Sequence, residues 1–159
     1  MPSARSGHRM ALWKNFIVLF GGFYDNYIET KYYDDLWIFD IQNGKWNKIE
    51  IADICKPSAR SGFVFIPYEG GIVLHGGYYK KYSKKDKAQG LVLNDTWLLR
   101  MSSQLNQIKW EKRKKSGMCP SARCGMSAVA FKNKAVVFGG VYDEELSDEH
   151  MKTTCYNDM

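Results

Sequence analysis

One short sequence recurs three times along the 159-residue chain, and this repeat limits the possible folds more than any other feature. The hexapeptide Pro-Ser-Ala-Arg-Ser-Gly occupies residues 2–7 and 57–62, and Pro-Ser-Ala-Arg-Cys-Gly occupies residues 120–125. An apolar run that ends in two glycines follows each copy, with the glycine pairs at residues 21–22, 76–77 and 139–140. Both markers advance by 55 and then by 63 residues, so the chain is built from structural repeats.

Each complete repeat contains four short segments rich in β-branched and aromatic residues. After the glycine pair comes Asp-Leu-Trp-Ile-Phe at residues 35–39, which matches Asp-Thr-Trp-Leu-Leu at residues 95–99. A Lys-Trp pair follows at residues 45–46 and 109–110, whereas the third repeat stops at Asn-Asp-Met, residues 157–159. Segments of this composition without helical spacing are typical of strands. Four strands per repeat of this length predict one β-propeller blade per repeat.

The order Arg-x-Gly, Gly-Gly, aromatic segment and tryptophan, which in the first repeat ends at Phe39 and Trp46, resembles the kelch repeat. The resemblance covers essentially the whole chain. It implies an all-β fold, a fragment of a kelch-type β-propeller with two complete four-stranded blades and a truncated third. The expected divisions are residues 1–52 for blade 1, 53–115 for blade 2 and 116–159 for the partial blade 3. We expect large aromatic side chains to pack one blade face on the next, namely Trp37, Trp46, Trp97 and Trp110.

Fewer than three blades do not close a propeller, because propellers typically have about 4–8 blades. The sequence therefore predicts a fragment of a longer protein or a truncated gene product. An open arc leaves unpaired strand edges and bare blade faces at both ends. We expect the chain either to associate with copies of itself or to be poorly soluble.

Composition and cysteine spacing indicate the cellular environment. The chain is 45% hydrophobic, enough for one core, but its longest apolar stretches, at residues 16–20 and 135–138, are too short to span a bilayer. The N-terminal residues do not resemble a secretion signal. The cysteines Cys55, Cys119, Cys124 and Cys155 lack zinc-site spacing. The expectation is a soluble intracellular protein, cytoplasmic or nuclear, with free thiols, no metal, no cofactor and no membrane partner.

The connections between second and third strands, residues 23–34, 78–94 and 141–157, are long and should share one rim of the propeller. The first is rich in tyrosine, the second in lysine and the third in acidic residues. We hypothesise that this rim binds another protein through Tyr27, Tyr32, Lys80, Lys81, Lys84, Glu144 and Glu145. The alternative is that the basic and acidic connections pair with each other and stay solvated. Tyr24, Tyr79 and Tyr142 recur two residues after each glycine pair, which favours a packing role for them.

Arg5, Arg60 and Arg123 begin the expected innermost strand of each repeat. Three guanidinium groups near the propeller axis could bind carboxylates of a partner, so these arginines are also candidate contact residues. The alternative is that each arginine holds backbone carbonyls at a blade junction. Recurrence with the fold favours this structural interpretation.

A second basic cluster brackets Trp110 on the predicted outer strand and consists of Lys109, Lys112, Arg113, Lys114 and Lys115. Together with the chain's net charge of +6, this cluster leaves open a second function, that of a basic module that contacts RNA or ribonucleoprotein. Lysine on an edge strand also prevents edge-to-edge pairing, and we favour that explanation.

An enzymatic function finds no support in the sequence. His8, His75 and His150 lie in different contexts and do not indicate one metal centre. There is no nucleophile motif and no phosphate-binding glycine loop before a helix. The sequence therefore predicts a non-catalytic scaffold for protein–protein interaction.

Overall fold

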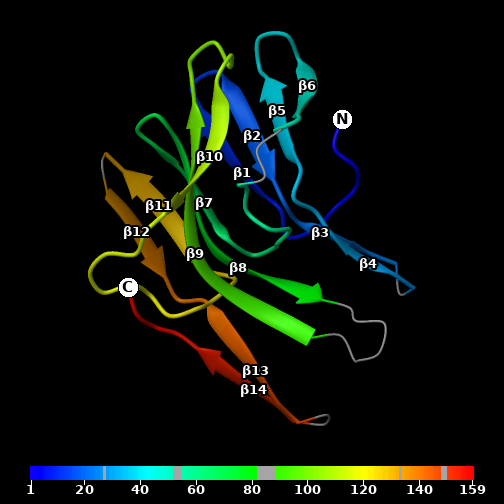
Figure 1. Ribbon diagram of the computed structural model, residues 1–159, viewed down its shortest axis with the longest axis vertical. Helices are drawn as coiled ribbons and strands as arrows, with labels where there is room; N and C mark the ends of the chain where they lie inside the picture. Colours follow the sequence, from blue (N-terminus) through cyan, green and yellow to red (C-terminus); the bar gives the residue numbers. More distant parts are fainter. Residues whose placement is uncertain (27, 52–54, 82–88, 133, 148–149) are drawn as a thin grey trace.

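The regular structure in the described part of the chain consists of β-strands that form blades side by side (Figure 1). The computed structural model describes residues 1–26, 28–51, 55–81, 89–132, 134–147 and 150–159. Blade 1 is an antiparallel sheet of β1 (Arg9–Trp13), β2 (Phe16–Phe20), β5 (Leu36–Asp40) and β6 (Lys45–Ile49), in that order. Blade 2 has the same order, with β7 (Val64–Tyr68), β8 (Gly71–Lys81), β9 (Gln89–Met101) and β10 (Ile108–Arg113). Blade 3 contributes β11 (Ser127–Phe131) and β12 (Lys134–Phe138).

This topology confirms the predicted fold class, two four-stranded blades and a partial third. The boundary expected between residues 52 and 53 falls outside the described residues. No helix that could span a membrane occurs in the part of the chain that the structure describes.

The connections between second and third strands are β-hairpins rather than loops. β3 (Phe23–Asp25) pairs with β4 (Thr30–Tyr32), and β13 (Val141–Ser147) pairs with β14 (His150–Cys155). In blade 2 the strands β8 and β9 simply continue past a register shift between His75 and Gly77. The three hairpins project from the same end of the blades (Figure 1). The tyrosines, threonines and valines of these connections favour a ladder of backbone hydrogen bonds over an irregular loop.

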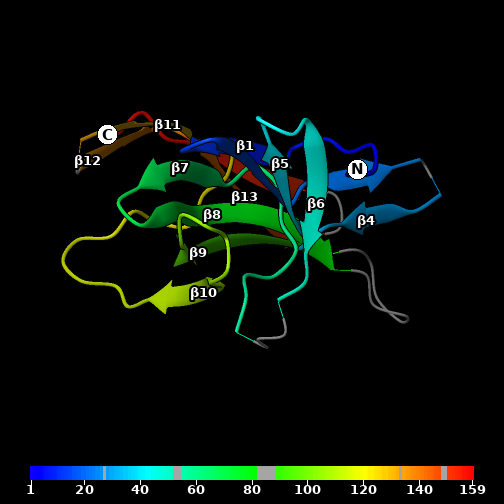
Figure 2. The same ribbon diagram turned by 90° about the horizontal axis from the view of Figure 1, so that it is seen from above.

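The first strand of each blade is the innermost one, as predicted. β7 contacts both β1 and β11, and Figure 2 shows the strands of blade 2 following it in the order β8, β9 and β10. The glycines before these strands hydrogen-bond across the blades: Gly62 N donates to Gly7 O at 3.1 Å, and Gly125 N to Gly62 O at 2.8 Å. All three have positive φ, and a Cβ on Gly7 would lie 3.0 Å from the Ser61 Cβ. Glycine therefore permits this close approach.

The core lies between blades 1 and 2. Along β1 every second residue faces it, so that Ala11 and Trp13 are buried while Met10 and Leu12 are exposed. The Phe20 ring of blade 1 lies 5.1 Å from the Trp110 ring of blade 2, centroid to centroid. The largest cluster of buried side chains contains Trp13, Val18, Phe20, Ile38, Phe63, Phe65, Ile72, Leu74, Trp97, Leu99 and Trp110.

Of the four tryptophans expected to join the blades, Trp97 and Trp110 are buried in this core. Trp37 and Trp46 are half-buried on the other face of blade 1, at the end of the arc. Between blades 2 and 3 the buried cluster is smaller and consists of Val64, Ile66 and Met126. The same fold thus has one strong and one weak blade junction.

Candidate functional site

Each blade contains an internal cluster centred on its repeated arginine. In blade 2 the Arg60 guanidinium donates to Asp95 Oδ1 at 2.6 Å and Asp95 Oδ2 at 3.1 Å. It also donates to Gly76 O, Ser58 O and Ser58 Oγ, each at 3.0 Å. Asp95 in turn accepts a 2.7 Å hydrogen bond from Trp97 Nε1. A guanidinium has five N–H donors, so all donors of Arg60 are used within the blade.

The same arrangement recurs in the other blades. Arg5 binds both carboxylate oxygens of Asp35 at 2.5 and 2.9 Å, and Arg123 binds both oxygens of Asp158 at 2.5 and 3.1 Å. Each also donates to a serine two residues earlier and to the first carbonyl of the glycine pair. The side chains of Arg5, Arg60 and Arg123 are 3%, 1% and 6% exposed. This geometry supports the structural interpretation of the arginines, so we place the candidate binding surface elsewhere.

The paired aspartates were noted in the sequence only as part of a repeated segment. Burial alone would raise the pKa of Asp95, but hydrogen bonds from Arg60 and Trp97 outweigh it and hold that pKa below its ordinary value of 3.8. The pKa of Asp35 is lowered in the same way against the same effect of burial. A usable signal did exist, because Asp-x-Trp recurs at residues 35–37 and 95–97. The pairing itself was not predicted because Asp95 lies 35 positions from Arg60, beyond any local pattern.

The glycine pairs join each arginine loop to the preceding blade. Gly22 N donates to Arg60 O at 2.8 Å, and Gly77 N donates to Arg123 O at 3.1 Å. Gly77 has a φ of +107°, and a Cβ there would lie 2.8 Å from Ser61 O. These contacts leave no room for a side chain. The hairpins therefore begin at rigid positions on the blades.

Aromatic contacts anchor the first two hairpins. Tyr32 stacks on Phe23 at 5.6 Å and meets the Tyr78 ring edge-on at 6.4 Å, so it joins the first hairpin to the second. Tyr24, by contrast, is 43% exposed, whereas Tyr79 is half-buried. The packing role expected for Tyr24 is therefore wrong. In the first hairpin Phe23, directly after the glycine pair, faces inward and alternation along the strand turns Tyr24 outward, whereas Tyr79 and Tyr142 are half-buried.

The remaining rim candidates lie on the second and third hairpins. Lys80, Lys81 and Glu144 are exposed. Within the described residues, no ion pair joins the basic hairpin to the acidic one. Tyr27 and Lys84, and the side chain of Glu145, lie outside the described part of the structure.

The outer basic cluster surrounds one carboxylate. Glu111 lies 3.0 Å from Lys109, 3.2 Å from Arg100 and 3.9 Å from Arg113. Hydrogen bonds from Lys109 and Arg100 lower the pKa of Glu111. The Nζ of Lys112 lies 5.5 Å from the centre of the Trp97 ring. One carboxylate thus offsets part of the positive charge of this cluster, chiefly that of Lys109 and Arg100.

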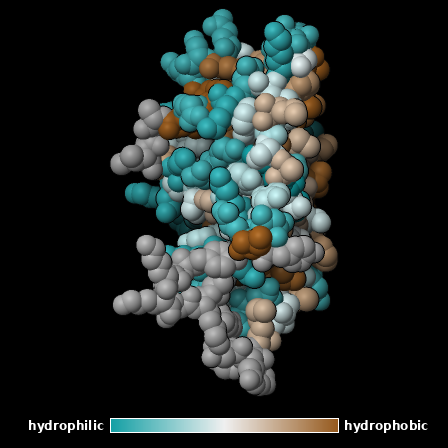
Figure 3. Space-filling view, turned by 90° about the vertical axis from the view of Figure 1, so that its right-hand side faces the viewer, coloured by the Kyte–Doolittle hydropathy of each residue, from teal (hydrophilic) through white to brown (hydrophobic). Residues whose placement is uncertain are grey.

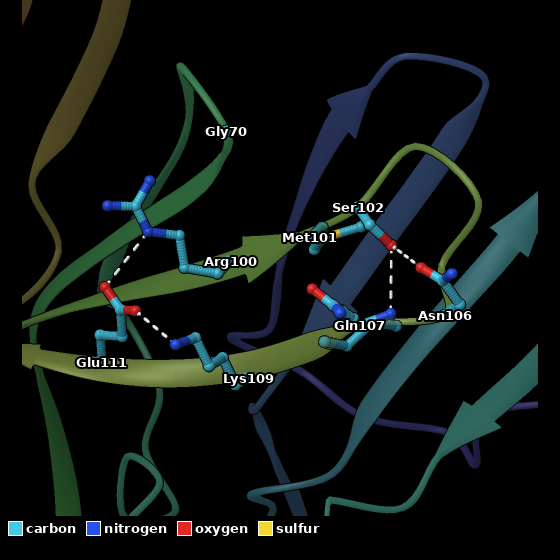
Figure 4. Close-up of a pocket in the computed structure, with 9 residues that line it drawn as sticks. Gly70, Arg100, Met101, Ser102, Asn106, Gln107, Lys109 and Glu111 are labelled. Carbon is cyan, nitrogen blue, oxygen red and sulfur yellow. Dashed lines mark hydrogen bonds and ion pairs between the residues drawn. The ribbon is translucent and has the colours of Figure 1, made fainter.

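A shallow pocket of about 830 Å³ lies beside this cluster (Figure 4). Figure 4 shows Glu111 between Arg100 and Lys109 on one side of it. On the other side Ser102 Oγ donates to Asn106 Oδ1 at 2.6 Å and accepts from Gln107 N at 3.1 Å. Because these polar groups already bind one another, we assign no ligand to this pocket.

The histidines and cysteines do not assemble into a reactive centre. His8 and His75 lie in different blades, and no group of three metal-binding side chains occurs among the residues that the structure describes. The cysteines are free, as predicted. Burial raises the pKa of Cys124, which makes its thiol a poor nucleophile.

On the face drawn in Figure 3, hydrophilic side chains dominate and hydrophobic ones gather along one edge. The structure thus offers a polar rim of hairpins on a rigid scaffold of blades. Such a surface fits recognition of another macromolecule better than catalysis.

Comparison with known proteins agrees with this architecture. A search of curated proteins finds kelch domain-containing protein 2 of Homo sapiens, 26% identical over 144 residues, which cover 87% of this chain and 33% of that protein. Tip elongation aberrant protein 1 of Schizosaccharomyces pombe is 30% identical over 139 residues, 87% of this chain and 11% of that protein. Host cell factor 1 of Homo sapiens is 29% identical over 154 residues, 87% of this chain and 7% of that protein.

The chain thus spans about a third of the length of kelch domain-containing protein 2. The finer likeness to kelch domain-containing protein 4, predicted from residues 5–10, 19–23, 70–73 and 139–141, stays a prediction. Among solved structures, YjhT superposes with a TM-score of 0.61 at 16% identity, covering 94% of this chain and 45% of that one.

The family model described as the KLHDC2/KLHL20/DRC7 Kelch-repeats domain matches residues 1–140. This match includes the repeated arginines, the glycine pairs and the tryptophans described above. The chain belongs to this kelch-repeat family.

Proposed function

We propose that the chain is a non-catalytic interaction module that binds a partner protein through its three hairpins. The observation that carries the proposal is the row of exposed, chemically distinct side chains at one end of the blades. Tyr24 offers an aromatic surface, Lys80 and Lys81 a positive one, and Glu144 a negative one. Aromatic anchors flanked by charge are typical of protein interfaces.

The rigidity of the scaffold supports the same function. The arginine clusters and the inter-blade glycine contacts hold the base of each hairpin, so little ordering is needed when a partner binds. Three of the four free cysteines are exposed, which fits a protein that acts in a reducing compartment, the cytoplasm or the nucleus.

Binding of RNA through the outer strand is the second candidate. Lys114 and Lys115 are exposed directly after this strand and could contact phosphates. The ion pairs of Glu111 reduce the charge available from its neighbours, so we favour the hairpins.

Affinity capture from a lysate, with identification by mass spectrometry, tests the proposal. The rim variant carries Tyr24→Ala, Lys80→Glu and Lys81→Glu. The matched control carries Lys114→Glu and Lys115→Glu, the same change in charge on the outer strand. We expect a set of proteins that the natural chain and the control retain and the rim variant loses.

Retention of the same proteins by the rim variant would refute the role of the hairpins. If the outer-strand variant alone loses material, and that material disappears on nuclease treatment or at moderate salt, RNA is the partner instead.

A further inference from the structure

Exposed apolar side chains gather on the two blade faces that end the arc. On blade 3 they are Val129 (61% exposed), Phe131 (69%), Val136 (44%) and Phe138 (52%). On blade 1 Met10 is 53% and Leu12 is 60% exposed, and Trp46 is half-buried on the same face, at the other edge of the sheet. Contiguous exposed apolar surface of this kind marks an interaction site.

These two faces are equivalent to the two sides of the interface between blades 1 and 2, which the chain already forms internally. In the strand registers Phe138 pairs with Ser127 as Phe20 pairs with Arg9, so blade 3 and blade 1 superpose residue by residue. The exposed residues of blade 3 occupy the positions of Ala11, Trp13, Val18 and Phe20, all buried against blade 2.

The exposed residues of blade 1 occupy the positions that, in blade 2, contact the side chains of the preceding blade. Met10 corresponds to Phe65 in the register of blade 2, and Phe65 packs against Phe20 at 6.4 Å between ring centroids. Trp46 lies on the fourth strand of blade 1 at the position that Trp110 has in blade 2, and the Trp110 ring also contacts the Phe20 ring. The face of blade 3 therefore has its complement on blade 1.

Backbone groups at the two ends match in the same way. Inside the arc each blade's glycine N–H donates to the glycine carbonyl of the blade before it. At the ends, Gly7 N and Gly140 N have no hydrogen-bond acceptor and Gly125 O has no donor among the described residues. A second arc placed after blade 3 would bring Gly7 N of one copy to Gly125 O of the other. It would also bring Gly140 N to Arg5 O, the counterpart of the Arg60 and Arg123 carbonyls that Gly22 and Gly77 use.

We propose that two copies of this chain associate head to tail, with blade 3 of each packed on blade 1 of the other. The pairing closes one ring of about six blades, within the usual range for propellers. The superposition on YjhT, which uses 45% of that chain, shows that the arc is about half of a solved protein of this fold. Each interface is heterologous, yet the assembly closes after two copies. The hairpins stay free, so this proposal and the proposed function can fail independently.

Light scattering behind a sizing column tests the pairing on the natural chain, with an expected mass of twice 18.3 kDa. Phe131→Glu on blade 3 and Leu12→Glu on blade 1 should each give a monomer. Mixed together, these two variants should form a weaker one-to-one dimer through the single interface that carries neither substitution, blade 3 of the Leu12→Glu copy on blade 1 of the Phe131→Glu copy. Ile28→Glu, at a hairpin position that is 93% exposed, is the control and should stay dimeric.

Circular dichroism verifies that each variant is folded, and Val129→Glu serves as a second blade 3 variant. A monomeric natural chain would overturn the proposal. So would a dimer that survives either substitution, a concentrated mixture of the two variants that contains no heterodimer, or an open series of larger species.

Discussion

Replacement of Arg60 by methionine measures what the internal arginine clusters contribute to stability. Methionine fills a similar volume but removes all five donors from a side chain that is only 1% exposed. Asp95, 23% exposed, would keep the hydrogen bond from Trp97 Nε1, while Gly76 O would lose the Arg60 donor. Removal of one partner of a buried ion pair costs about 3–5 kcal/mol. Because Asp95 retains some solvent contact, we expect the lower end, about 3 kcal/mol.

Arg123→Met is the matched control in blade 3. Arg123 makes the same five hydrogen bonds, but the Asp158 side chain is 61% exposed and would be solvated after the substitution. The loss should then be about 1–2 kcal/mol, the cost of the hydrogen bonds without a stranded buried charge. The difference between the two variants isolates the effect of burying the carboxylate.

Urea unfolding followed by tryptophan fluorescence, at concentrations too low for association, gives both free energies of unfolding. The pKa of Asp95 is depressed in the folded chain, so the pair stabilises it above pH 3.8 and this contribution is lost as the pH falls below that value. The gap between the natural chain and Arg60→Met should therefore shrink in acid. Equal losses in the two variants, or a loss below about 1 kcal/mol for Arg60→Met, would refute this account of the clusters.

Three further predictions concern single residues. Gly77→Ala should lower the free energy of unfolding in urea by about 2–4 kcal/mol, because the added Cβ would meet a backbone oxygen. Gly44→Ala, which has open space around the added Cβ, should cost only about 1 kcal/mol. Equal costs for the two substitutions would contradict this prediction. Burial lowers the pKa of His75, so stability should be full above the ordinary value of 6.5 and fall as the pH drops below it. In urea unfolding measured at several pH values below 6.5, His75→Phe should reduce the loss of stability with falling pH to the part that His8 causes. An unchanged dependence of stability on pH would contradict this prediction. Burial raises the pKa of Cys124, so a thiol reagent at neutral pH should label it more slowly than the three exposed cysteines until the chain is unfolded, and uniform rates in the native chain would be the contrary result.

One side chain contributes to the weakness of the junction between blades 2 and 3. His75 stands where blades 1 and 3 have phenylalanine, and its Nδ1 lies 2.8 Å from Thr96 Oγ1 while Nε2 is buried without a partner. The equivalent Phe20 fills its site with three aromatic contacts. An imidazole with an unsatisfied nitrogen stabilises the junction less than a phenyl ring does.

Most of the architecture could be read from the sequence, because it rests on local patterns. Recurring segments define the repeats, alternation of large apolar residues defines the strands, and glycine at fixed positions marks backbone that only glycine adopts readily. The burial of Trp97 and Trp110 between blades followed from the same repeat.

The tertiary structure alone decided which polar groups meet and which side chains face outward. Arg60 finds Asp95 across the blade, so a residue considered for partner binding is internal. In the first hairpin, strand register places Tyr32 inside and Tyr24 outside, a choice that a one-residue shift would reverse. Sequence patterns report periodicity along the chain, whereas the Arg60–Asp95 pair and the contact of Tyr32 with Tyr78 join segments 35 and 46 residues apart, which meet only when the blades form and pack.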